Sequence, residues 1–330
     1  MDLSLIIPVY NRPREVEELL ESLTAQTSRD FEVVIVEDGS VDRCAGQAER
    51  YKASMDIKYF YKENSGPGPS RNYGFQKAGG NYAVFLDSDC VLPPGYVGVV
   101  REALTNAWTD AFGGPDRAGQ SFTTLQKAIN YAMTSFLTTG GIRGGGEKLD
   151  KFYPRSFNMG YSRQVFEATG GFSQMRFGED IDMSIRILEA GFQTRLIKEA
   201  FVYHKRRTSL KQFFKQVYNS GIARINLNKR HPGALKPVHT LPSFFTLGVA
   251  LLILLSVLFS PYFLLPIGFF ALMAFFDAAL RNKSLGVGLL AVAASFIQLT
   301  GYGSGFISAF WKRIILKKDE FAAFTQNFYK

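Results

Sequence analysis

Two carboxylates one residue apart, Asp87 and Asp89, follow the apolar run YAVFL in the segment FLDSDCVLPPG. Like charges this close repel each other unless something positive lies beside them. Pro93 and Pro94 come shortly afterwards, so the pair lies at the end of a predicted strand. The spacing indicates either a solvated turn or a cation site, and oxygen ligands of this kind favour Mg²⁺ or Mn²⁺ over zinc.

A second acidic pair, Glu179 and Asp180, lies near the start of the segment FGEDIDMSIRILEAG. The apolar residues of this segment recur at helical spacing, which predicts a helix that begins near Gly178 and ends at Gly191. Its dipole favours anions in the first turn. Adjacent residues point about 100° apart around a helix, so the two carboxylates are not interchangeable.

The elements that must position these residues alternate between strand and helix. Strand-like runs cover residues 3–10, 31–40, 57–62 and 82–89, and amphipathic or glycine-bounded helical segments separate them. This alternation predicts an α/β fold with a parallel sheet and helices on both faces. Ligands of such sheets bind beyond the carboxyl ends of the strands. Asp38, at the end of the second strand, is therefore expected to share one crevice with the acidic pair of the fourth.

The usual phosphate-binding loops are missing from this pattern. The first strand ends in PVYNRP, with neither the GxGxxG turn of a dinucleotide fold nor the GKS or GKT of a P-loop. A diphosphate must therefore be held in another way, and a metal ion held by carboxylates is the obvious device.

The composition changes sharply after about residue 237. Residues 241–280 carry one charge, Asp277, and a third apolar block covers residues 284–310. Since a spanning helix needs about 20 apolar residues, we predict three membrane segments at 241–259, 261–280 and 284–310, with a break in the third at GYGSG. They follow a predicted globular domain of residues 1–230. The alternative is a buried pair of core helices in a soluble protein.

The net charge of +9 is concentrated beside these apolar blocks, in residues 204–216, 228–236 and 311–318. Positive charge beside such segments marks a cytoplasmic, anionic membrane face. Nucleic acid could also bind basic runs, but these border segments of membrane-spanning length, so nucleic acid is not the expected partner. Three spans would place the two ends on opposite sides, so either the third block is re-entrant or its basic tail lies outside.

The expected location of the globular domain is the cytoplasm. No signal peptide precedes the first strand, so we expect a multi-pass protein of the cytoplasmic (inner) membrane with residues 1–230 facing the cytoplasm. Cys44 and Cys90 offer neither a disulfide framework nor zinc-ligand spacing, and we read them as reduced, small apolar residues.

Five motifs together resemble the family-2 inverting glycosyltransferases with the GT-A fold. PVYNR, VVIVEDGS, NSGPGPSRNYGFQKAGG, FLDSD and GEDIDMSIRILEAG occur in the order and approximate spacing of that family, over residues 3–230. The apolar segments extend the resemblance to membrane-anchored members. It implies a doubly wound mixed sheet, a nucleoside diphosphate sugar as donor, and Mg²⁺ or Mn²⁺. The apolar anchor and the basic segment point to a lipid-linked or cell-envelope glycan as acceptor.

The resemblance also implies roles for single residues. Donor-binding residues would be Pro8, Tyr10, Asp38, Arg71, Asn72 and Asp87, with Ser70 replacing the usual alanine before Arg71. The predicted metal ligands are Asp89, Asp87 and His204, and the predicted catalytic residues are Asp180, as general base, and Glu179.

Three alternatives remain open at this point. A processive polysaccharide synthase would carry a QxxRW element, but Gln216 is followed by Asn219 and Ser220 at the matching positions. A sugar nucleotidyltransferase normally has a glycine-rich signature after the first strand, which is missing. The third alternative is a catalytically inactive, membrane-anchored module that binds sugar nucleotides.

Overall fold

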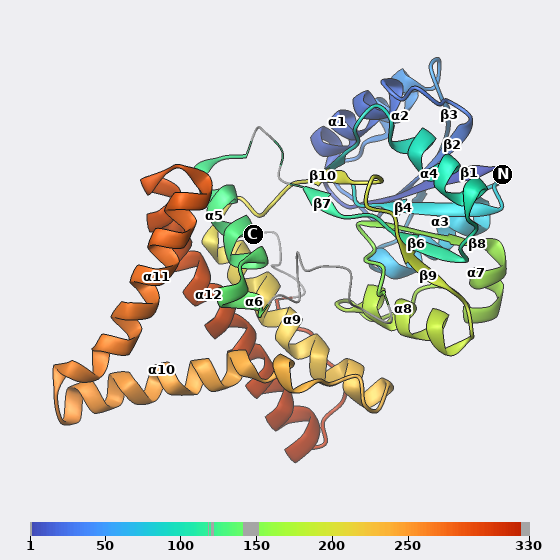
Figure 1. Ribbon diagram of the computed structural model, residues 1–330. Helices are drawn as coiled ribbons and strands as arrows, with labels where there is room; N and C mark the ends of the chain where they lie inside the picture. Colours follow the sequence, from blue (N-terminus) through green and yellow to red (C-terminus); the bar gives the residue numbers. More distant parts are fainter. Residues whose placement is uncertain (1, 118, 120–121, 141–151, 325–330) are drawn as a thin grey trace. The chain divides into compact units, whose positions relative to one another are not determined.

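A seven-stranded mixed sheet is the largest element of the computed structural model, which describes residues 2–117, 119, 122–140 and 152–324 (Figure 1). In spatial order the strands are β3 (Asp56–Lys62), β2 (Phe31–Asp38), β1 (Leu3–Val9), β4 (Tyr82–Leu86), β8 (Asn158–Ser162), β6 (Ala111–Gly113) and β9 (Thr194–Leu196). The first four are parallel, whereas β8 runs antiparallel to both β4 and β6. The predicted α/β mixed sheet is confirmed.

Helices cover both faces of this sheet, because successive strand residues point to opposite sides. Leu5 and Ile7 of β1 belong to one buried cluster, and Ile6 between them belongs to the other. The first cluster is completed by α1 (Pro13–Thr24), α2 (Ala45–Tyr51) and α4 (Tyr96–Asn106). The second is completed by α3 (Pro67–Lys77), α7 (Arg163–Thr169) and α8 (Glu179–Glu189). The alternation seen in the sequence thus becomes two hydrophobic layers around one sheet.

A smaller sheet lies beside the acidic pair and contains β5 (Cys90–Val91), β10 (Val202–His204) and β7 (Asp116–Arg117), in that order. β5 begins directly after Asp89, and β10 ends in His204. The two strands are antiparallel, with His204 opposite Cys90. This pairing brings two distant parts of the chain together at one place.

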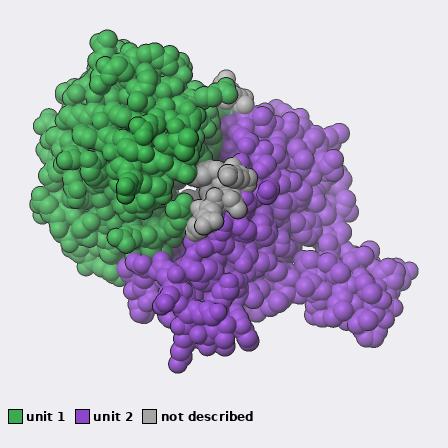
Figure 2. All heavy atoms as spheres, turned by 180° about the vertical axis from the view of Figure 1, so that it is seen from behind, with its two compact units in different colours: residues 1–119, 149–205 green, residues 120–148, 206–330 purple. Residues whose placement is uncertain are grey.

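The remaining helices form a second compact unit, coloured separately in Figure 2. They are α5 (Thr124–Thr134), α6 (Phe136–Thr139), α9 (Leu210–Arg230), α10 (Leu241–Leu258), α11 (Leu265–Asn282) and α12 (Leu285–Ala309). One unit contains residues 1–119 and 149–205, and the other contains 120–148 and 206–330. The units do not follow the expected boundary at residue 230, because α5 and α9 pack against the apolar helix α12.

Within the described residues, three helical stretches are long and apolar enough to cross a membrane: Pro237–Leu258, Pro261–Asn282 and Leu285–Ile315. They match the three predicted segments. The predicted break at GYGSG is wrong, since α12 continues through residues 301–305. A Cβ atom on Gly305 would lie 2.0 Å from the carbonyl oxygen of Tyr218, and one on Gly303 would lie 2.3 Å from that of Pro242. These glycines therefore permit close helix contacts instead of interrupting the helix.

Candidate active site

The candidate site lies at the carboxyl edge of the parallel strands. Arg12 follows β1, Asp38 ends β2, and Asp87 and Asp89 follow β4. Because β2 and β4 are the two neighbours of β1, and adjacent strands lie about 4.8 Å apart, these side chains start from neighbouring strand ends at one edge of the sheet. The strand order meets this condition of the prediction, and the shared role of Asp38, Asp87 and Asp89 stays a prediction.

Cationic groups surround the two carboxylates of the FLDSD motif. Arg71 Nη2 lies 2.7 Å from Asp87 Oδ1, and Arg12 Nη1 donates to Asp89 Oδ2. His204 Nε2 lies 3.1 Å from Asp89 Oδ1 and 3.9 Å from Asp87 Oδ2. Asp89 is only 8% exposed, so a solvated turn does not describe it. The charges of Arg12 and Arg71 offset the repulsion between the carboxylates, and the imidazole of His204 comes to them from a third segment of the chain.

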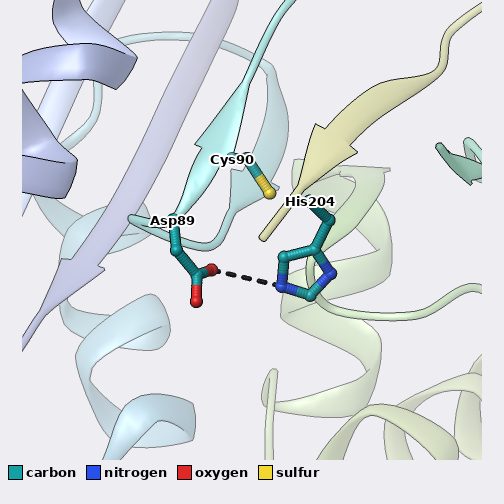
Figure 3. Close-up of side chains that lie close together, drawn as sticks. All are labelled: Asp89, Cys90 and His204. Carbon is teal, nitrogen blue, oxygen red and sulfur yellow. Dashed lines mark ion pairs between the residues drawn. The ribbon is translucent and has the colours of Figure 1, made fainter. Parts of the chain in front are cut away.

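His204 reaches the acidic pair through the β5–β10 pairing, and Figure 3 shows its ring facing the Asp89 carboxylate. The ring stacks on Phe157, with centroids 5.0 Å apart. Its Nδ1 atom is buried and has no hydrogen-bond partner among the described residues. Packing therefore holds the imidazole with Nε2 directed at the carboxylates.

The same residues fit a divalent cation. Ligand atoms of Asp89, Cys90 and His204 all lie within 4.8 Å of one another. Cys90 is the least suitable member, because burial and the neighbouring carboxylates raise the pKa of its thiol well above the usual range, and the thiol donates to the carbonyl oxygen of Phe157. A protonated thiol does not ligate metals. The carboxylate oxygens of Asp89 and Asp87 are of the kind that Mg²⁺ or Mn²⁺ prefers, and His204 offers an imidazole nitrogen beside them.

Helix α8 places the second acidic pair as predicted. Gly178 precedes it with a φ of 86°, a backbone conformation that glycine adopts readily. Glu179 Oε1 accepts from Arg71 Nη1 at 3.0 Å, whereas Asp180 Oδ2 accepts from Arg155 Nε at 2.5 Å. Both carboxylates are buried, and they point to different partners, as their positions around the helix require.

The two carboxyl groups of α8 differ in acidity. Burial, reinforced by the charge of Asp180 and opposed by that of Arg71, raises the pKa of Glu179 to about 7. Burial alone would also raise the pKa of Asp180, but the charge and hydrogen bond of Arg155 outweigh it and hold this pKa below its usual range. Asp180 is therefore ionised at neutral pH, as a proton acceptor must be.

Arg71 connects the two acidic pairs. Its guanidinium, only 3% exposed, contacts Asp87 with one terminal nitrogen and Glu179 with the other. The planar fork of arginine suits such a bridge, because its two terminal nitrogens can each face one carboxylate. The motif that ends β4 and the motif that begins α8 are thereby held on opposite sides of one side chain.

Asp38 is buried, and its carboxylate organises the loop before α3. It accepts from the backbone N–H groups of Ser65 and Gly66, both at 2.9 Å, and from Lys62 Nζ. The Asp38–Lys62 pair lies at the carboxyl ends of β2 and β3, where the two residues are opposite each other. Its predicted role in donor binding stays a prediction.

Three further predicted donor-binding residues lie outside the cluster of ion pairs. Pro8 lies near the end of β1, opposite Val36 of β2 and beyond the last residue that pairs with β4. Tyr10 follows and is 40% exposed. The side-chain amide of Asn72 donates to the carbonyl oxygen of Phe172 and accepts from its N–H, both at 2.8 Å. Asn72 thus positions the segment before α8.

Sequence reasoning assigned no role to Arg12, Lys62 or Arg155, each of which pairs with a predicted site carboxylate. Arg12 and Lys62 carried a usable signal, since both follow or end a strand of the parallel sheet, where the acidic residues also gather. Arg155 lies in a connecting segment whose path no local pattern predicts.

Comparison with known proteins places this arrangement in a family. The family model described as Glycosyl transferase family 2 matches residues 4–170, about half of the chain. The chain belongs to glycosyl transferase family 2. A second model, Glycosyl transferase family group 2, matches residues 156–279 of this family-2 glycosyltransferase.

Relatives of this family-2 glycosyltransferase share different lengths of it. An uncharacterized glycosyltransferase of Haemophilus influenzae is 32% identical over 221 residues, which cover 63% of this chain and 70% of that protein. An uncharacterized glycosyltransferase of Rickettsia felis is 45% identical over 86 residues, but these cover 26% of this chain and only 14% of that protein.

Solved structures also resemble this chain over most of its length. The mannosyltransferase PcManGT from Pyrobaculum calidifontis, in complex with GDP-Man and Mn²⁺, is similar with a TM-score of 0.57 and 18% identity, over 96% of this chain and 88% of that chain. At this identity the likeness concerns the fold. It agrees with the mixed α/β sheet expected for the GT-A fold.

Proposed function

We propose that this protein is an inverting, metal-dependent glycosyltransferase that moves one sugar from a nucleoside diphosphate sugar to a lipid-linked or cell-envelope glycan acceptor. The observation that carries the proposal is the Arg71 bridge, which holds Asp87 and Glu179 on two sides of one guanidinium. A donor bound at the acidic pair would then lie beside the start of α8, within reach of a base. The relative PcManGT, whose structure holds GDP-Man and Mn²⁺, supports a donor and a cation of this class.

The donor would lie over the carboxyl ends of β1, β2 and β4. Asp38 accepts hydrogen bonds from the base or ribose, with Pro8 and Tyr10 beside it, and Arg71 donates to the base or a phosphate. Asp89 and His204, with Asp87 beside them, would hold Mg²⁺ or Mn²⁺, which when bound neutralises charge on the departing diphosphate.

The acceptor hydroxyl would approach from the α8 side. Asp180 takes its proton, which makes the oxygen a competent nucleophile, and attack opposite the diphosphate inverts the anomeric centre. Arg155 Nε donates to Asp180 Oδ2. When the acceptor binds, this hydrogen bond must either break or leave the carboxylate able to accept the proton of the hydroxyl group. Glu179 keeps Arg71 in place, which makes it a positioning residue in this scheme.

The membrane-associated helices and the basic runs support a location at the cytoplasmic face of a membrane, with the catalytic unit in the cytoplasm. A lipid-linked acceptor presents its reacting end at that surface. Processive synthesis is the second candidate; the missing QxxRW element disfavours it, and product length decides between one added sugar and a polymer.

The test uses the full chain purified in detergent, with UDP-, GDP- and dTDP-sugars and Mn²⁺, and scores donor hydrolysis and transfer. We expect Asp89→Asn and chelation each to lower transfer by about 100-fold or more, since a catalytic cation supplies several kcal/mol. Asp180→Asn should abolish transfer to acceptor, and Asp30→Asn, at an exposed carboxylate, is the matched control. Undiminished transfer by Asp89→Asn, or with chelator present, would show that the metal assignment is wrong.

A further inference from the structure

Helix α12 is covered from one end to the other by α5 and α9 (Figure 1). At its start, Val287 and Ala291 pack with residues of α5. Farther along, Ala294 packs with both α5 and α9, and Phe306 and Ala309 pack with α9. The contact with α9 is so close that a Cβ atom on Gly221 would lie 2.1 Å from the carbonyl oxygen of Tyr302. Helices α9 and α12 must therefore lie at similar depths relative to a membrane.

The composition of α9 is incompatible with the interior of a bilayer. Its 21 residues include five positive charges and no negative one: Lys211, Lys215, Arg224, Lys229 and Arg230. A charged side chain at the centre of a membrane costs at least about 2.5–3.5 kcal/mol. If α12 crossed the membrane, it would take several of these charges of α9 with it, so α12 is not expected to cross.

The other side of α12 contacts α10 and α11. A Cβ atom on Gly288 would lie 2.8 Å from that of Ala279 in α11, and one on Gly303 would lie 2.1 Å from Thr246 Oγ1 in α10. α10 and α11 expose apolar side chains over most of their surfaces. Only 6% and 17% of their most apolar 18-residue stretches are buried, against 39% for α12. The lipid-facing surface of this unit is therefore supplied mainly by α10 and α11.

The two basic runs that flank the apolar helices meet each other. Lys229 Nζ donates to the carbonyl oxygen of Arg313 at 3.2 Å, and Arg313 Nε donates to Asn226 Oδ1 at 3.1 Å. Arg230 also pairs with Glu320, at 2.9 Å. The chain that enters α10 and the chain that leaves α12 consequently lie on the same side of any membrane.

We propose that only α10 and α11 enter the bilayer and that α12 lies along its surface, with α5 and α9 on the aqueous side. The partner of this surface is an anionic lipid headgroup layer, which the adjacent basic runs complement in charge. An even number of passages removes the conflict between three spans and positive charge at both ends. The inference rests on the proposed membrane location, but not on the transfer reaction.

Single-cysteine labelling across α12 tests this topology on the full chain. Cys44 and Cys90 are completely buried, which leaves a clean background. Leu285→Cys and Leu289→Cys report the start of α12, at positions 74% and 68% exposed, and Lys318→Cys reports the exposed chain beyond its end. Each is treated with a membrane-impermeant maleimide in inside-out vesicles and in spheroplasts, with detergent-solubilised protein as the control for total reactivity.

We expect the start and the end of α12 to react from the same face. Reaction from opposite faces overturns the proposal, and so does reaction of both start positions only after detergent is added. Protein found in the soluble fraction would overturn the membrane location together with the topology. Sugar transfer measured on the same variants reports separately on the proposed function. A failure of the proposed topology can therefore be distinguished from a failure of the proposed reaction.

Discussion

Replacing Arg71 by methionine tests whether the bridge between the two acidic motifs holds the fold together. The variant leaves the carboxylates of Asp87 and Glu179 without their shared partner, and Glu179 is almost fully buried. Breaking a buried ion pair in this way costs about 3–5 kcal/mol. We expect a value near the lower end, about 3 kcal/mol, because the Asp87 side chain is 31% exposed and water can compensate part of its charge.

This loss should appear as a lower melting temperature of the full chain in detergent. For a unit of this size, 1 kcal/mol corresponds to about 2–4 °C, so the expected decrease is on the order of 10 °C. Arg50→Met removes an exposed pair with Glu17 and is the matched control, with an expected cost below about 1 kcal/mol. Adding Glu179→Gln to Arg71→Met should recover part of the loss, because the buried negative charge is then removed.

The pH dependence of this loss has a definite sign. The pKa of Glu179, about 7 in the folded protein, exceeds its ordinary value of 4.5, so this group favours the folded state less as pH rises between those values. Without Arg71 its pKa rises further, and the difference in melting temperature between parent and variant should be larger at pH 8 than at pH 5. A decrease equal to that of Arg50→Met, or one independent of pH, would refute the bridging role.

Two further predictions concern other contacts. Arg155→Gln removes the charge that lowers the pKa of Asp180 while its burial remains, so the acid limb of the kcat–pH profile should move to higher pH. An unchanged limb would contradict Asp180 as the base or Arg155 as its partner during catalysis. Gly305→Leu should lower the free energy of unfolding of the solubilised protein by about 1–3 kcal/mol or more, measured as a lower melting temperature. Gly248→Leu, where a Cβ atom meets nothing within 4 Å, is the control and should be tolerated. Equal losses in the two variants would mean that the close approach of Tyr218 to α12 does not restrict the residue at position 305.

Local pattern was enough to predict the elements that carry the site. Apolar strand residues followed by carboxylates, and the helical segments that separate the strands, occur in the structure where the sequence indicated them. The helix of the second acidic pair also begins after Gly178, as expected. These features depend on backbone sterics and on hydrophobic periodicity, which act over a few residues.

Local pattern misled where a residue type serves long-range packing. GYGSG contains three glycines, which weaken an isolated helix, and a break was therefore predicted. In the structure, each glycine instead makes room for another helix. The stabilisation comes from contacts with α9 and α10, partners that no window along the chain reveals.

The sequence by itself determined the α/β class, the acidic motifs at the strand ends, and the apolar segments, because charge, periodicity and turn residues are local properties. Only the tertiary structure decided which basic side chain contacts which carboxylate. Arg12, Arg71, Arg155 and His204 reach their acidic partners through strand order and loop paths, and such contacts form between residues far apart in the chain. The structure likewise showed that the two basic runs around the apolar helices meet, since hydropathy measures how apolar a helix is but not what lies beside it.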